Sequence, residues 1–172
     1  MSLETFQQRV LPMKDKLYRL AFRLLQNVQE AEDAVQETMI RIWAKREEWG
    51  QWQSLEAYCM ISIKNGCLDR LRKQKLRSVP ENKAWDISSP DKDPQEKMMA
   101  KEMTIQIMKC MDELPQQQQL VIQLREIEGL SYNEIAEVLD MSLDQVKVNL
   151  FRARSAIKRS IIQTPSACDR KA

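Results

Sequence analysis

Side chains that can read base edges and bind phosphate gather in one short segment near the C-terminus. They are Ser142, Asp144, Gln145, Lys147, Val148, Asn149 and Arg152. Glutamine and asparagine amides pair with base edges, while lysine and arginine bind guanine or backbone phosphate. One helix through this segment would present most of these groups to a single groove. The pattern therefore predicts binding to nucleic acid.

That helix is the second of two predicted helices that begin with the same cap. Ser131 is followed three residues later by Glu134, and Ser142 is followed three residues later by Gln145. Each pair is a capping box, which marks the start of a helix. The spacing leaves room for one short helix and a turn at Asp140, a residue type that tolerates left-handed backbone. Short helix, turn and basic helix outline a helix-turn-helix, whose second helix enters the DNA major groove.

A second basic segment lies in the first half of the chain, on a helix predicted from Leu55 to about Lys75 with Ser54 as its cap. Its basic residues are Lys64, Arg70, Arg72, Lys73, Lys75 and Arg77, against the single acid Asp69. Trp49, Trp52 and Tyr58 lie near its start, and bases with aromatics suit single-stranded nucleic acid. Residues 30–37 hold four acids and no base, which suggests a separate protein contact.

The residue types that most catalysis needs are missing or badly spaced. The chain has no histidine, the commonest general base, and no glycine-rich phosphate loop. Its four cysteines, Cys59, Cys67, Cys110 and Cys168, form no CxxC pair. We therefore expect no enzyme, metal site, cofactor or small-molecule substrate. No signal peptide or membrane span is visible, so we expect a cytoplasmic protein.

Composition and periodicity predict an all-α protein of two small helical domains joined by a flexible linker, with the helix-turn-helix in the second. The 172 residues include only 3 Gly and 6 Pro. Leu17, Leu20, Ala21, Leu24 and Leu25 form one apolar helical stripe. Proline and polar residues at positions 78–95 indicate the linker. We expect domains at 1–77 and 96–164, and a tail at 165–172.

Three segments together resemble a bacterial sigma factor of the extracytoplasmic-function (ECF) group of the sigma-70 family. The first is residues 30–43, from Glu30 to Trp43. The second is residues 63–72, and the third runs from Leu114-Pro115 through residues 129–136 to Arg154. The resemblance covers about residues 12 to 162 in the family's order. It implies an alternative sigma factor that binds core RNA polymerase and directs promoter-specific initiation.

The resemblance also implies a role for each segment. By this resemblance, the residues that dock on the β′ clamp helices of the polymerase are Asp33, Gln36, Glu37 and Ile40. The residues that contact the minus-10 element are Trp52, Asn65, Asp69, Arg70, Arg72 and Lys73, and the loop from Trp49 to Gln53 could hold a flipped base. The residues that contact the minus-35 element are the seven from Ser142 to Arg152 listed above. Further implied partners are the polymerase β flap and an anti-sigma factor.

Two other classes of protein fit part of the sequence. A helix-turn-helix regulator that binds operators as a dimer explains residues 114–162, but leaves the acidic residues 30–37 and the basic residues 64–77 without a role. A helical adaptor that does not bind DNA is the other alternative. Oligomeric state separates the first from a sigma factor, because operator readers are usually two-fold dimers. Salt-dependent DNA binding would exclude the second.

Overall fold

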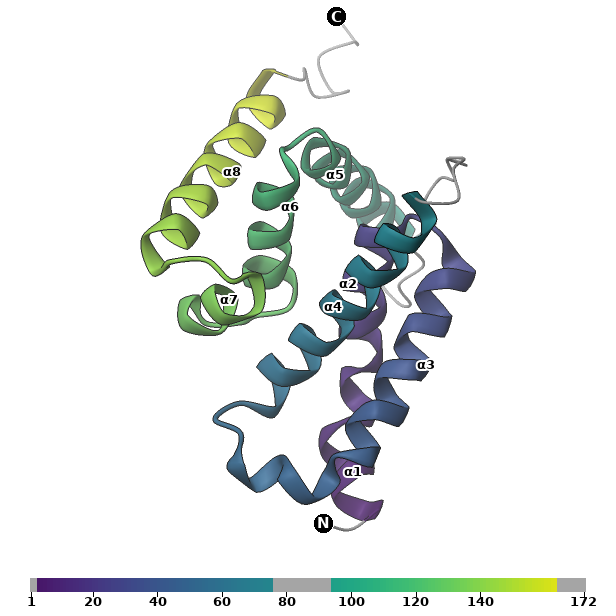
Figure 1. Cartoon of the computed structure of the whole chain (residues 1–172). Helices are drawn as coiled ribbons and strands as arrows, with labels where there is room; N and C mark the ends of the chain where they lie inside the picture. The colour runs from purple at the N-terminus through teal and green to yellow at the C-terminus, as the bar shows by residue number, and fades with distance from the viewer. Residues whose placement is uncertain (1–2, 76–93, 164–172) are drawn as a thin grey trace, which may run out of the picture. The chain divides into compact units, whose positions relative to one another are not determined.

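The computed structural model describes residues 3–75 and 94–163, and these residues form helices and no strand. They divide into two compact units (Figure 1). The first contains α1 (Leu3–Arg9), α2 (Lys14–Leu25), α3 (Val28–Ala44), α4 (Leu55–Lys75) and α7 (Tyr132–Leu139). The second contains α5 (Pro94–Asp112), α6 (Gln116–Ile122) and α8 (Leu143–Gln163). The all-α prediction is confirmed.

The core of the first unit is the packing of α2, α3 and α4 against one another. The predicted stripe of α2 is buried throughout, with Leu17 and Leu20 fully enclosed. Ile42 from α3 and Met60 and Ile63 from α4 are equally buried. Two short 3₁₀ helices, Leu11–Met13 and Arg46–Gln51, link the longer ones. This core fixes α3 and α4 side by side, which matters for the charged groups they carry.

Local signals in the sequence set the ends of these helices. Gln26 closes α2 in the left-handed region with φ of 54°, and the Asn27 side chain then accepts from the backbone N–H of Glu30 to begin α3. The Ser54 hydroxyl accepts from the N–H of Ala57 at the start of α4. The predicted cap at Ser54 is therefore confirmed, and Asn27 caps α3 in the same way.

One segment groups differently from the predicted domains. Residues Leu130–Met141, which contain α7, belong to the first unit, because α7 packs against α4. The sequence had placed this helix with the C-terminal domain at 96–164. The local sequence pattern predicts that α7 forms. The surface on which α7 packs depends on residues that are far away in the sequence, so that pattern does not predict it.

The second unit is a packing of α5, α6 and α8, with Met111, Val121, Leu124 and Leu150 in its core. Pro115 is the N-cap of α6. Residues Gln123–Ile127 widen into a π-helical turn before Gly129, which has φ of +77°. Met103 on α5 is 54% exposed.

Several predictions fall on positions that the structure does not describe. Most of the linker at 78–95, the tail at 165–172, Arg77 and Cys168 are among them, although α5 already begins at Pro94, inside the predicted linker. Within residues 3–75 and 94–163, no helix is both long and apolar enough to cross a membrane.

Candidate nucleic-acid interface

The second cap of the predicted helix-turn-helix has the expected geometry. The Ser142 hydroxyl accepts from the backbone N–H of Gln145 at 3.2 Å, and the Ser142 N–H donates to the Gln145 side chain at 2.9 Å. These reciprocal bonds satisfy two of the backbone groups that a helix start leaves open. They fix where α8 begins, and hence which residues share its exposed face.

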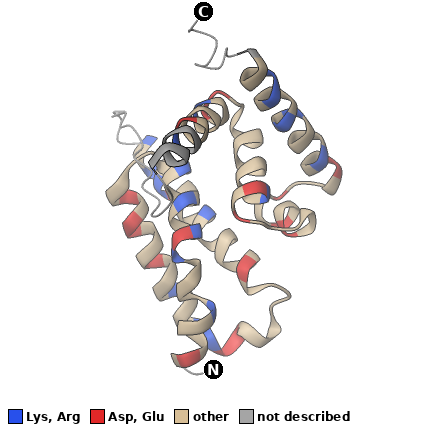
Figure 2. Cartoon of the chain, turned by 180° about the vertical axis from the view of Figure 1, so that it is seen from behind, with Lys and Arg blue, Asp and Glu red and all other residues tan. Residues whose placement is uncertain are grey.

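Six of the seven predicted minus-35 residues are exposed on α8 or its cap: Ser142, Asp144, Gln145, Lys147, Val148 and Arg152. The seventh, Asn149, is half-buried and donates its amide to the backbone carbonyl of Gln145 at 2.9 Å. The second amide N–H and the amide oxygen of Asn149 then remain for a base. Lys147 lies 4.0 Å from Asp144, a weak and exposed ion pair. Figure 2 shows basic residues recurring along α8.

Sequence reasoning missed Phe151, which is 72% exposed on α8. It follows Lys147 by four residues and Val148 by three, so it lies on their face of the helix. A large exposed apolar side chain between basic neighbours is unusual, and apolar groups can contact the thymine methyl in the major groove. The helical spacing could have identified it, but a phenylalanine in an amphipathic helix is more readily taken as core.

The turn and the preceding helix also match the prediction. Asp140 ends α7 in the left-handed region, with φ of 53° and ψ of 51°. At the other end of α7, the Ser131 hydroxyl accepts from the N–H of Glu134, and the Ser131 N–H donates to Glu134 at 2.9 Å. Both predicted capping boxes of the helix-turn-helix are therefore confirmed.

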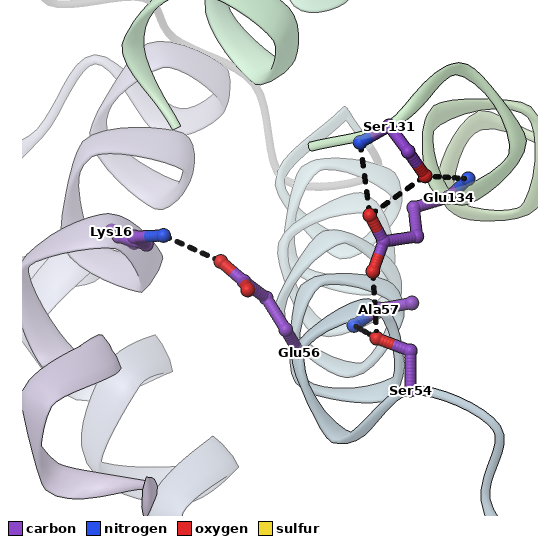
Figure 3. A network of polar contacts seen from close by, with 6 residues as sticks. All are labelled: Lys16, Ser54, Glu56, Ala57, Ser131 and Glu134. Atoms are coloured by element: carbon purple, nitrogen blue, oxygen red, sulfur yellow. Dashed lines mark hydrogen bonds and ion pairs between the residues drawn. The ribbon is translucent and has the colours of Figure 1, made fainter. Parts of the chain in front are cut away.

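Glu134 does more than cap α7 (Figure 3). Its Oε1 accepts from the Ser54 hydroxyl at 2.8 Å, so the caps of α4 and α7 share one carboxylate. The backbone N–H of Ser131 lowers the pKa of Glu134, partial burial opposes this, and the hydroxyls of Ser131 and Ser54 lower it further. Nearby, Lys16 from α2 pairs with Glu56 from α4 at 2.5 Å. The start of α4 is thus tied to both α2 and α7.

The aromatic residues around the start of α4 separate into one core residue and one half-buried pair. Trp49 is buried, and its indole N–H donates to the carbonyl of Ile42 at 3.0 Å. Trp52 stacks on Tyr58 with ring centroids 3.7 Å apart. A cavity of about 620 Å³ lies beside them, lined by Arg9, Lys16 and the loop from Trp49 to Ser54. Trp49 therefore cannot stack on a base, whereas Trp52 borders a space of suitable size.

Four of the predicted minus-10 residues on α4 are exposed: Asn65, Asp69, Arg72 and Lys73. Arg72 pairs with Asp69 one turn earlier, at the surface. Arg70 is different, because its side chain is only 20% exposed and reaches back to α3. Its Nη1 donates to Glu30 at 2.9 Å and its Nη2 to Glu37 at 2.6 Å. The predicted DNA residue Arg70 and the predicted polymerase residue Glu37 are therefore partners in this structure.

The predicted polymerase face of α3 is a continuous exposed strip. Asp33, Gln36, Glu37 and Ile40 are all exposed, and Ile40 is 70% exposed. Their spacing of three and four residues places them on one side of the helix. Figure 2 shows the acidic residues along this helix. An isoleucine left in solvent among acids is a feature of a protein-binding surface rather than of a DNA-binding one.

The second unit has an apolar groove of about 500 Å³ between α5, α6 with its π-helical turn, and α8. Ile107, Met108 and Ile157 line its floor, while Glu126 and Arg154 pair at its edge. Grooves of this kind accept the apolar face of a partner helix.

The cysteines are free thiols where the structure describes them. Cys59 and Cys67 are buried in α4, and burial is the main reason that the pKa of each thiol is raised to about 12. Each thiol is therefore neutral at physiological pH and unreactive. In the described part of the chain, no three Cys, Asp or Glu residues gather where they could hold a metal ion.

Comparison with known proteins agrees with this geometry. Residues 10–77 match sigma-70 region 2 and residues 104–157 match sigma-70 region 4. The ECF sigma factor SigE of Mycolicibacterium smegmatis is 28% identical over 161 residues, which is 91% of this chain and 62% of that protein. SigW of Bacillus subtilis is 28% identical over 157 residues, 86% of this chain and 84% of SigW.

Solved structures give the same fold. The sigma factor RpoE of Bartonella quintana, crystallised with the anti-sigma factor NepR, superposes with a TM-score of 0.74 at 21% identity. The superposition covers 95% of this chain and all of that one. Regions 2 and 4 occur here in the family's order, on the helices that carry the exposed acidic and basic faces. The chain belongs to the sigma-70 family and, through its relatives, to the ECF sigma factors.

Proposed function

We propose that this chain is an alternative sigma factor that binds core RNA polymerase and directs promoter-specific initiation. The proposal rests on two exposed surfaces in one chain. One is the face of α8, whose start is fixed by the two reciprocal hydrogen bonds between Ser142 and Gln145, and the other is the exposed face of α3. A dimeric operator reader needs only the first of these surfaces. The domains we propose are residues 1–77 for polymerase and minus-10 contacts and 96–164 for the minus-35 element, and the family is not a family of enzymes.

Two surfaces are proposed to bind polymerase. Asp33, Gln36, Glu37 and Ile40 would meet the β′ clamp helices, with Ile40 as the apolar anchor among charges. The apolar groove between α5, α6 and α8 would receive the β flap. A groove with an apolar floor and charged edges selects an amphipathic segment, which supports this assignment.

Promoter recognition would use α4 and α8. At the minus-10 element, Asn65, Arg72 and Lys73 would contact DNA directly, and the cavity beside Trp52 would hold a base taken from the stack. At the minus-35 element, Lys147 and Arg152 would bind phosphate or guanine, and Gln145 would read a base edge. Phe151 joins this set as an apolar contact.

Regulation by an anti-sigma factor is proposed from the family and from its solved relatives. RpoE of Bartonella quintana was crystallised with the anti-sigma factor NepR, and CnrH was solved in complex with the cytosolic domain of CnrY. We place the chain in the cytoplasm, where bacterial RNA polymerase acts. This location also suits free cysteines.

The polymerase contact can be tested on its own by gel filtration and by titration with fluorescently labelled chain. The double variant Asp33→Lys/Ile40→Asp should lower the affinity for sigma-free core polymerase about 10- to 100-fold, because it removes an apolar anchor and reverses a charge. Glu47→Lys, a charge reversal in the 3₁₀ helix outside the proposed face, is the matched control. Equal affinities for both variants would remove α3 from the interface, and a stable dimer without core binding would favour the operator reader.

A further inference from the structure

The guanidinium of Arg70 holds two carboxylates of α3 at once. Its two terminal nitrogens donate to Glu30 and Glu37, which lie two helical turns apart on α3. Partial burial lowers the pKa of Arg70, and the hydrogen bonds to Glu30 and Glu37 raise it by more, so the group stays charged. A two-pronged contact of this kind is strong and geometrically demanding.

This arrangement sets the local charge on that side of α4. One positive group faces two negative ones, so a phosphate approaching Arg70 meets a net negative cluster. Two of the five N–H donors of the Arg70 guanidinium are directed at α3 carboxylates, which leaves fewer donors for DNA. In the chain alone, the basic face of α4 is therefore weakened at Arg70, although Arg72 and Lys73 next to it are exposed.

The two carboxylates differ in what else can reach them. The Glu37 side chain is 59% exposed and belongs to the strip that includes Asp33 and Ile40. The Glu30 side chain is 35% exposed and lies one turn before Asp33, at the N-terminal end of the same helix face. A basic group of a protein docked on the strip therefore reaches the more exposed Glu37 more readily, while Glu30 keeps its hold on Arg70.

We propose that Glu30 and Glu37 are positioning residues for Arg70, and that docking of core polymerase on Glu37 releases one arm of Arg70 for promoter DNA. This inference rests on the proposed function. Glu30 then acts as the retained anchor and Glu37 as the exchangeable partner. The device makes DNA binding stronger in the polymerase complex than in the chain alone. By linkage, DNA on Arg70 favours polymerase on Glu37 by the same factor.

The test is a double-mutant cycle on the full chain without polymerase. The probe is a fluorescent single-stranded DNA of mixed sequence, and the readout is anisotropy at low salt. Glu37→Gln should tighten binding about two- to five-fold, the range expected for freeing one exposed ion-pair partner. That gain should disappear when Arg70→Gln is also present. Glu32→Gln, an exposed charge removal on the same helix that does not touch Arg70, is the control.

Two results would overturn the proposal. One is a gain with Glu32→Gln equal to that with Glu37→Gln, and the other is a gain that persists with Arg70→Gln. Arg70→Lys keeps the charge without the two-pronged geometry, and it replaces Arg70→Gln if circular dichroism shows that variant unfolded.

A second titration, of core polymerase with the Arg70→Gln variant, measures the coupling between the polymerase contact and the DNA contact. It also tests this coupling separately from the proposed function. Arg70→Gln leaves Glu37 unpaired, so its affinity for core polymerase should rise, again about two- to five-fold. An unchanged affinity would contradict the coupling. Failure of the unmodified chain to bind core at all would refute the proposed function, while the DNA cycle would still report on the Arg70 contact.

Discussion

The sharpest prediction concerns two arginines on α8 that carry the same charge in different surroundings. Arg152 is exposed and, among the residues that the structure describes, has no ion-pair partner. Arg154 is also exposed, but it pairs with Glu126 at the edge of the apolar groove. Arg152→Ala should therefore remove a phosphate contact, and Arg154→Ala should remove mainly an internal pair.

The size of the effect follows from counterion release. One phosphate contact contributes about 0.9 to the slope of log affinity against log salt concentration. Removing it should lower affinity about 15-fold at 50 mM salt and about 4-fold at 200 mM, because the electrostatic contribution shrinks as salt rises. Arg154→Ala should change the slope by much less than one contact, since its charge is already neutralised by Glu126.

The assay is anisotropy of a labelled duplex of mixed sequence, titrated with the full chain at several salt concentrations. The slope, rather than affinity at one salt, is the decisive quantity, because folding defects lower affinity at every salt alike. If both variants reduce the slope equally, or if Arg152→Ala leaves it unchanged, then the exposed face of α8 is not the surface that binds the backbone.

Two further predictions concern stability. Gly129→Ala should lower the free energy of unfolding by about 1 kcal/mol, because φ is +77° there. Gly50→Ala is the control, since an added Cβ at Gly50 meets no atom within 4 Å and φ is not positive there. Thermal unfolding should show a loss of stability for Gly129→Ala and not for Gly50→Ala. The lowered pKa of Glu134 makes its charged form favour the folded state above the ordinary value of 4.5, and this contribution is lost as pH falls through the folded-state value. Acid unfolding of Glu134→Gln should consequently depend less on pH than that of the unmodified chain; identical pH profiles would contradict the role of the Ser131 and Ser54 bonds.

Features encoded within a few residues could be predicted from the sequence. The caps at Asn27, Ser54, Ser131 and Ser142 each depend on side chains within three positions of the helix start. The left-handed turn at Asp140 is equally local. These signals locate the helix-turn-helix and the exposed face of α8 without any tertiary information.

Features that depend on distant residues could not be predicted. The hydrogen bond between Ser54 and Glu134 joins positions 80 residues apart, and Arg70 reaches 40 residues back to Glu30. Charge and the family resemblance marked Arg70 as a DNA contact, because the sequence does not show that α3 packs beside α4. Trp49 was likewise grouped with the aromatics suited to nucleic acid, although packing buries it. Periodicity predicts which helices form, but not which polar groups meet when they pack.

The most direct test is reconstitution with sigma-free core RNA polymerase. The purified chain and core would transcribe genomic DNA from the chain's own host, and the 5′ ends of the transcripts would be mapped. The account predicts discrete starts that share two spaced upstream motifs and that disappear when the chain is omitted. Starts that are no different without the chain, together with no co-elution with core, would contradict it.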